Sequence, residues 1–365
     1  MTFRRLVLSG FENRNKEMRI DADNLKLKII AIFEAMGSQT QEAVLVANSL
    51  VQANLKGHDS HGVGLVATYI SHFENGLLTP NTEVRLIRDD GAILMFDGGR
   101  GFGPRVAGDA MDRAIERCAE TGVVLMTIRN AHHIGRVGAY GDIAIAEGLI
   151  SIHFVNVTDH SPTVAPWGGA EPRFVTNPVC IAIPGTENTP PTMLDMATSK
   201  IALGKARVAM SKGEKLGPNL VIDNMGLPST DPSVVYDNPR GSLLPFGDYK
   251  GSGLALMCEL LAGGLSGGGT IQPGNPRQES IVNNMFTVLV DPERLVDVDW
   301  LRAEIDATVA YVKSARPTVT ERQVMVAGDP ERVCIIERTA DGITLNDEAW
   351  EELRAAAQRV GASID

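Results

Sequence analysis

Cysteine, aromatic residues and positive charge are all scarce in this chain of 365 residues. The four cysteines lie far apart in apolar segments and form no CxxC pair, which is typical of reduced core thiols and indicates a cytoplasmic protein. Lys and Arg number 34 against 45 Asp and Glu, so the formal net charge is -11 and nucleic acid or an anionic membrane is a poor partner. The N-terminus lacks a long apolar stretch, and no apolar run reaches the roughly 18 residues that span a bilayer. We expect neither export nor membrane insertion.

Hydrophobic content of 44% and charged content of 22% are typical of a globular protein. Apolar residues at helical spacing predict three helices near the N-terminus, over about residues 25–36, 38–56 and 63–74. Ser38 followed by Gln41 is a capping-box pattern at the start of the second helix. The first part of the chain is therefore expected to be helical.

The pattern changes after residue 80. Two apolar runs on either side of Asp90-Gly91 predict a β-hairpin. Further on, strand-like runs at 123–128 and 150–157 enclose a helical run at 137–147, which predicts a βαβ unit in an at least partly parallel sheet.

The order of these patterns predicts an α/β fold in which both chain ends build one helical lobe. We expect an N-terminal arm and helical lobe over residues 1–78 and a central α/β domain over 79–292. The C-terminal helices, over 293–365, are expected to return to the helical lobe.

A first group of functional candidates lies in a turn between two predicted helices. Gly57 and Gly62 flank His58, Asp59, Ser60 and His61. Loop histidines beside hydrogen-bonding groups can transfer protons near neutral pH. A polar turn that caps the following helix explains the same residues equally well.

A second group, Arg129–Arg136, follows the first strand of the βαβ unit and contains His132 and His133. Ligands bind at the carboxyl ends of strands in open α/β sheets, and arginines there suit an anionic substrate. His160, just beyond the next strand, is expected on the same rim. A solvated turn is the alternative for both segments, and we expect His72 and His153 to be structural.

Metal and nucleotide motifs are incomplete. His58 and His61 have HxxH spacing without the HExxH glutamate, so no metal site is expected. No GxGxxG or P-loop pattern is complete, although Lys250 lies at the start of a predicted helix that could hold phosphate. A metal-dependent hydrolase or lyase that uses His58, His61 and His133 stays open as an alternative function.

Five segments in a fixed order resemble the type 2 malate/L-lactate dehydrogenase family. They are DSHGV (59–63), RNAHHIG (129–135), SPTVAPWGGAEPRFVTNP (161–178), LDMATS (194–199) and LPFGDYKGSGLAL (244–256), within a resemblance that covers about residues 25–355. The resemblance implies a helical lobe made of both chain ends and a non-Rossmann central sheet that binds NADH or NADPH. It also implies a homodimer.

The resemblance also implies roles for individual residues. His61 and His133 match the family's acid/base histidines, and Ser60 adjoins them. The positions that match the family's cofactor contacts are Thr192, Met193, Leu194, Asp195, Met196, Ala197, Tyr249, Lys250, Gly328, Asp329 and Pro330. The implied reaction moves a hydride between the nicotinamide and a small 2-oxo or 2-hydroxy acid.

This chain departs from the family pattern around the substrate. Leu65 replaces an arginine that often holds the substrate carboxylate, and Asp159-His160 and His132 replace other common residues. We therefore expect Arg136 and His160 to bind the substrate. A catalytically inactive binding protein of the same fold is a further alternative.

Overall fold

The computed structural model describes residues 17–275, 277–319 and 322–364, and at its centre is a seven-stranded sheet in the order β2-β3-β4-β11-β5-β6-β7. The strands are β2 (Arg85–Asp90), β3 (Ile93–Asp97), β4 (Val123–His132), β5 (Ile150–Thr158), β6 (Val179–Ile183), β7 (Thr192–Met196) and β11 (Val282–Val290). The arm expected at the N-terminus lies, up to residue 16, outside the described residues.

The pairing of the strands confirms a partly parallel sheet. The hairpin predicted around Asp90-Gly91 joins β2 and β3, and β3 pairs in parallel with β4. The strands β4 and β5 of the predicted βαβ unit point the same way, but β11 lies between them and is antiparallel to both. The strands β4 and β5 are therefore not neighbours in the sheet. The strand between them, β11, lies about 120 residues further along the chain, and local sequence patterns cannot reveal such a distant pairing.

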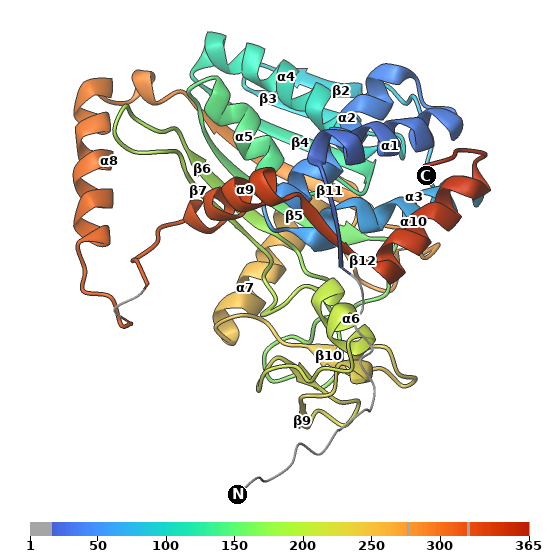
Figure 1. The fold of residues 1–365 in the computed structure, drawn as a ribbon. Helices are drawn as coiled ribbons and strands as arrows, with labels where there is room; N and C mark the ends of the chain where they lie inside the picture. Colours follow the sequence, from blue (N-terminus) through green and yellow to red (C-terminus); the bar gives the residue numbers. More distant parts are fainter. Residues whose placement is uncertain (1–16, 276, 320–321, 365) are drawn as a thin grey trace, which may run out of the picture.

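Helices cover both faces of this sheet (Figure 1). The helices α4 (Gly103–Thr121) and α5 (Gly138–Ala146) pack on one face and share a buried apolar core with β4, β5 and β11. On the other face lie α7 (Tyr249–Cys258) and the π-helical turn that follows it, Glu259–Gly264. With both faces covered, the sheet edges and strand ends are left to form sites.

Both ends of the chain build the helical lobe, as predicted. Its elements are α1 (Ala22–Ala35), α2 (Thr40–Leu55), α3 (Val66–Glu74), α9 (Asp329–Asp341), α10 (Asp347–Arg359) and the strand pair β1 (Glu17–Ile20) with β12 (Ile343–Asn346). One buried core joins Leu25 and Leu50 to Ile343 and Leu353. Because neither end can bury its apolar face alone, the lobe closes only when the two ends meet.

The start of α2 differs from the predicted capping box. Its N-cap is Gln39, with no side-chain hydrogen bond to the helix. The Ser38 hydroxyl donates instead to the buried carboxylate of Glu42, 2.8 Å away, and the backbone N–H of Asn81 donates to the same carboxylate. It is therefore Glu42 that ties the helix to a neighbouring loop, and Ser38 bonds to the same carboxylate rather than capping the helix.

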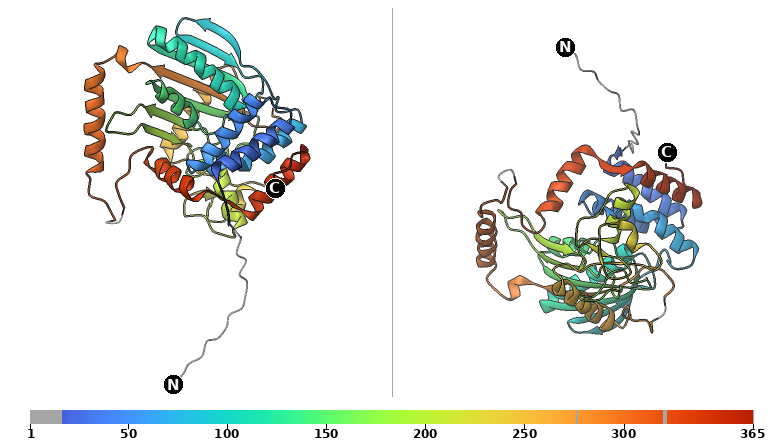
Figure 2. Two further views of the ribbon diagram at one scale, coloured as in Figure 1. Left: turned by 45° about the horizontal axis from the view of Figure 1, so that its top comes forward. Right: turned by 90° about the horizontal axis from the view of Figure 1, so that it is seen from below.

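The helix α8 (Val298–Lys313) does not join the helical lobe, although the C-terminal segment 293–365 was expected to return there. Figures 1 and 2 show it standing beside the far end of the sheet, away from α10. It is tied there by Asp306, which accepts hydrogen bonds from Thr186, Asn188 and Thr189 in the loop between β6 and β7. None of its side chains is buried.

A small unit lies beneath the sheet and completes the fold. The helix α6 (Leu203–Ser211) packs with a three-stranded sheet of β10 (Ser242–Leu243), β8 (Val221–Ile222) and β9 (Pro228–Ser229) around a separate apolar core. All four cysteines lie in described parts of the chain and are free thiols. Among the described helices, none has the length and apolar character that a membrane crossing needs.

Candidate functional site

The turn after α2 carries the first histidine group and is fixed from two sides. Gly57 takes a φ of 80°, which reverses the chain into a short 3-10 turn over Asp59–His61. Asp59 accepts hydrogen bonds from Asn54 of α2, at 2.7 Å, and from Arg338 of α9, at 2.6 and 2.9 Å. Asp59 therefore holds the turn in place, and the turn presents the side chains of its histidines.

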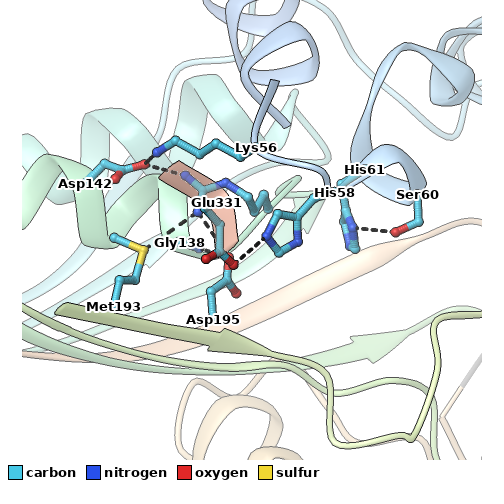
Figure 3. A network of polar contacts seen from close by, with 10 residues as sticks. Lys56, His58, Ser60, His61, Gly138, Asp142, Met193, Asp195 and Glu331 are labelled. Carbon is cyan, nitrogen blue, oxygen red and sulfur yellow. Dashed lines mark hydrogen bonds and ion pairs between the residues drawn. The ribbon is translucent and has the colours of Figure 1, made fainter. Parts of the chain in front are cut away.

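The structure brings His61 and His133 together, as the sequence predicts. Their rings are stacked, with centroids 5.6 Å apart and planes inclined by 17°. The Ser60 hydroxyl lies 3.1 Å from Nδ1 of His61 (Figure 3), and the Tyr69 hydroxyl lies 2.7 Å from Nδ1 of His133. Each imidazole is thus held at Nδ1 by a hydroxyl, which leaves its Nε2 available for a ligand.

Both imidazoles are neutral at neutral pH. Burial lowers the pKa of His61 to about 4, and the nearby Asp195 offsets only part of that effect. Burial also lowers the pKa of His133 well below its ordinary range, and the neighbouring His61 adds to the shift. Burial raises the pKa of Tyr69, so its hydroxyl stays protonated and can donate to His133. The Tyr69 oxygen can equally accept from Nδ1–H, and in that tautomer Nε2 of neutral His133 is unprotonated and can accept a proton.

An ion-pair network lies next to this pair (Figure 3). Asp195, in β7, accepts a hydrogen bond from the backbone N–H of Gly138 at the start of α5, at 2.9 Å, and pairs with Arg136 at 3.2 Å. Arg136 also pairs with Asp142, which Lys56 contacts at 2.5 Å. Asp195, which the sequence predicts as a cofactor contact, is also close enough to raise the pKa of His61.

This network changes the interpretation of Arg136. Its side chain is only 4% exposed, and its guanidinium is engaged by two carboxylates. Sequence reasoning expected it to grip the substrate carboxylate. A buried cation that already has two anionic partners has little capacity left for a third, so Arg136 is better placed to orient Asp195 and the start of α5.

His58 points away from His61. Its Nε2 lies 3.2 Å from Glu331 of α9, and this contact lowers the pKa of Glu331 (Figure 3). The HxxH pair therefore does not converge on a common point. In the described part of the chain, no three His, Cys, Asp or Glu side chains are placed to share a metal ion.

His132, adjacent to His133 in sequence, belongs to a different pair. Its Nε2 lies 2.8 Å from Nδ1 of His72, and both residues are buried. Burial lowers the pKa of His132 to about 3. Burial lowers the pKa of His72, and His160, which follows β5, adds to the shift, so it lies near this second pair. The structure gives His160 a hydrogen bond from Nδ1 to the carbonyl of Ser161, at 2.7 Å.

The predicted cofactor positions lie along β7, which is an edge strand of the sheet. Beside the start of β7, the N–H of Met193 donates to the carbonyl of Ala327, and Gly328 opens α9 with a φ of 94°. Just beyond its other end, the carbonyl of Thr198 accepts from Phe246, three residues before the start of α7. The remaining positions, Thr192, Leu194, Met196, Ala197, Tyr249, Lys250, Asp329 and Pro330, belong to these same segments. Two helix starts therefore flank one exposed strand.

Sequence reasoning missed two residues of the site. Tyr69 was counted only as part of a helical run; its helix α3 begins at Val66, after an extended break at Gly62, so helical spacing does not link it to His61. Glu331 follows the predicted cofactor segment directly and was not singled out. No periodic signal linked Tyr69 to His133, and the contact between Glu331 and His58 joins residues 273 positions apart.

Stacked imidazoles, a neighbouring carboxylate and an edge strand flanked by helix starts thus lie at one site. The family model for malate/L-lactate dehydrogenase matches residues 20–354. Hydroxycarboxylate dehydrogenase B of Escherichia coli is 40% identical over 94% of both chains, and an L-lactate dehydrogenase of Cupriavidus necator is 39% identical over 87% of this chain and 91% of its own. A solved structure of a putative malate/lactate dehydrogenase from E. coli has a TM-score of 0.90 and 40% identity, and covers 94% of this chain and 96% of that one.

These findings define the class of protein, an oxidoreductase with a nicotinamide cofactor. The chain belongs to the malate/L-lactate dehydrogenase family. The metal-dependent hydrolase or lyase considered from the histidine spacing has no support among these relatives, which are dehydrogenases.

Proposed function

We propose that this protein moves a hydride between NADH or NADPH and a 2-oxo acid, or in reverse from a 2-hydroxy acid. The observation that carries the proposal is the stacked His61–His133 pair beside Asp195, at the edge strand β7. A carbonyl reduction needs one proton donor near the reacting oxygen, and a nicotinamide, when bound, supplies or accepts the hydride.

The residues along β7 fit an extended dinucleotide. Leu194 and Tyr249 are 40% and 60% exposed, and Lys250 brings a cation to the start of α7. The strand β7, Thr192–Met196, extends about 13 Å. In this proposal Lys250 holds phosphate, and β7 orients the nicotinamide.

We assign the proton transfer to His133. In the free protein its imidazole is neutral, which is the form that removes the proton of a hydroxyl group when a 2-hydroxy acid is oxidised. In the reductive direction the carboxylate of a bound 2-oxo acid raises the pKa of the ring, so that the imidazole gains the proton it then donates. Tyr69 fixes the orientation of the ring through Nδ1, and Ser60 does the same for His61.

For the substrate carboxylate we propose Arg207 in place of Arg136. The helix α6 packs on the turn that carries the first histidine group, with the Cβ position of Gly204 3.1 Å from Cβ of Ser60. One turn further along α6, Nη2 of Arg207 lies 3.9 Å from the point where a Cβ of Gly64 would be. A cation from another segment thus reaches the neighbourhood of Leu65, where the family often has its arginine. His160 is proposed to line the outer side of the same pocket.

We further propose that the protein is a homodimer joined through α8. This helix has exposed apolar side chains, among them Trp300 at 57% and Tyr311 at 80%, and on α9 Ile336 is 71% exposed. A helix of this length that buries no side chain is only marginally stable by itself. The surface that packs against α8 therefore has to be present whenever the protein is folded. A second copy of the chain could always cover α8. In a dimer with a twofold axis, the α8 helices of both copies are covered in the same way. Light scattering should give twice the chain mass, and Tyr311→Glu should shift it toward one chain.

The proposed reaction is tested with a panel of 2-oxo acids, each with NADH and with NADPH, read at the absorbance of the reduced nicotinamide. Arg207→Met should raise KM by about tenfold or more, because a charged hydrogen bond is lost, while cofactor affinity is kept. The matched control is Lys205→Met on the same helix. Equal effects of both substitutions would remove Arg207 from the substrate site, and no oxidation of either cofactor with any acid would reject the proposed reaction.

A further inference from the structure

A polar cavity of about 210 Å³ lies beside the ends of β3, β4 and β5, among residues that the proposed reaction does not use. Arg100 lines it from the segment after β3, Asn130 from β4, and Thr158 and Asp159 from the end of β5. Gln278 closes it from the segment before β11. The cavity has room for several water molecules or one small organic acid.

Arg100 brings an unused donor to this cavity. Its Nη2 donates to Asp159 at 2.9 Å, but its Nη1 is buried and has no hydrogen-bond partner among the described residues. The second oxygen of Asp159 accepts from the backbone N–H of Gln278. A buried guanidinium nitrogen without an acceptor is costly, and such groups normally find a partner in a ligand or an ordered water.

The backbone around the cavity is strained at three points. Arg100, Asn130 and Asp159 have φ angles of 58°, 56° and 61°, in the left-handed region that favours glycine. They are three of the eight non-glycine residues with positive φ in the described ranges. The strain is held in place, because Arg100 N–H donates to the carbonyl of Asn130 at 2.8 Å and Asn130 N–H to Asn284 at 2.9 Å. Strain of this kind, held by surrounding contacts, gathers where a chain grips a ligand.

Two buried histidines separate this cavity from the proposed hydride-transfer site. The charge of Arg100 contributes to the low pKa of His132, and Asp159 acts on His72. His133 instead contacts Tyr69 and His61 on the other side of that pair. A ligand at Arg100 therefore touches the neighbours of the proposed site without entering it.

We propose that the cavity around Arg100 is a second binding site of this protein and that it takes a small carboxylate. The charge of Asp159 is already matched by Arg100, and the remaining donors are Nη1 of Arg100 and the side-chain amide of Gln278, which suit an anionic acceptor. The volume limits the ligand to a few carbon atoms. The proposal does not depend on the reaction assigned above.

Malonate is a suitable probe because it has no oxo or hydroxyl group to react. Its binding to the full chain is measured by calorimetric titration at fixed ionic strength. Gln278→Glu should weaken binding by about tenfold, since it sets a negative charge beside the cavity on an exposed residue. Gln52→Glu, exposed on α2, changes the net charge equally and should leave affinity within about twofold.

A second pair of variants keeps the test independent of folding defects. Arg100→Met combined with Asp159→Asn removes the donor without leaving an unpaired carboxylate, and it should also weaken malonate binding by about tenfold. His133→Ala should leave the affinity unchanged. The proposal is overturned if wild-type protein binds no malonate at about 10 mM, or if His133→Ala abolishes binding while Gln278→Glu does not, because the malonate would then be in the hydride-transfer site.

Discussion

Two pairs of histidines flank Tyr69, and they differ in what their ring nitrogens contact. In the pair His61–His133 the rings stack, and each Nδ1 contacts a hydroxyl rather than the other ring. In the pair His72–His132 the two rings are hydrogen-bonded to each other and are buried. The first pair has nitrogens free to meet a substrate, whereas the second pair joins its two rings inside the protein, and the other ring nitrogen of His132, Nδ1, is buried.

The comparison shows that neighbours in sequence can have opposite roles. His132 and His133 are consecutive, and successive side chains of an extended segment point to opposite sides. His132 therefore packs between the helical lobe and the sheet, against His72. His133 points to the other side, toward the turn of His61. Residue type alone does not assign a role here, because the direction of the side chain decides it.

The largest expected effect is on catalysis at position 133. His133→Asn should lower kcat by about 10² or more, the usual scale for losing acid/base catalysis, with little change in cofactor affinity. The same substitution at the adjacent position, His132→Asn, is the matched control and should change kcat by less than about fivefold. Similar losses from both would erase the distinction between the two pairs. If only His61→Asn proved severe, the proton would belong to His61.

The free energy of unfolding should depend on the second pair, His72–His132. His132→Leu leaves Nδ1 of His72 without its buried partner, and we expect unfolding to become easier by about 1–3 kcal/mol. The half-buried His160, near the same pair, provides the control substitution, His160→Leu, with a change of no more than about 0.5 kcal/mol. Chemical denaturation of both variants makes the measurement. An unchanged stability of His132→Leu would show that the hydrogen-bonded pair contributes nothing.

The pH dependence of stability sharpens the same contrast. The pKa of His132 is about 3 in the folded protein, against about 6.5 when unfolded. Below the unfolded value the unfolded chain binds the proton and the folded chain does not, so stability falls as the pH falls from about 6.5 toward 3, by up to about 1.4 kcal/mol per pH unit. His132→Leu should therefore show a shallower loss between pH 7 and pH 5 than wild type, by urea titration at each pH. An equal slope would mean that His132 takes up its proton before the protein unfolds.

The smallest expected effect is at Tyr69, which lies between the pairs. Tyr69→Phe keeps the ring and removes only the hydroxyl that orients His133, so kcat should fall by about three- to tenfold while KM changes little. The pH profile of kcat should shift as well, because Nδ1 loses its hydrogen-bond partner, and a purely structural tyrosine would not move that profile. Ser60→Ala makes the matching change at His61. A Tyr69→Phe variant with wild-type kcat and an unshifted profile would rule out the positioning role.

Much of this site could be anticipated from sequence, and the limits have physical causes. The turn at His61 and the loop at His133 were identified because polar residues and glycine interrupt apolar patterns, and their meeting followed from the family resemblance. The engagement of Arg136 by Asp142 and Asp195 could not be predicted, since the partners lie on different elements and charge pairing leaves no periodic trace. For the same reason, the sequence did not predict that β11 lies between β4 and β5, or that α8 lies apart from the helical lobe.

The central position of β11 has a consequence for how the chain folds. Loop closure over more than a hundred residues has to precede the pairing of β11 with β4 and β5, and such non-local contacts slow folding. A growing chain on the ribosome cannot complete the sheet until residue 290 has emerged. Until then, the edges of β4 and β5 that pair with β11 stay unpaired. Until then the sheet that later supports the site is two separate halves, and a chain truncated before β11 should aggregate rather than form a smaller enzyme.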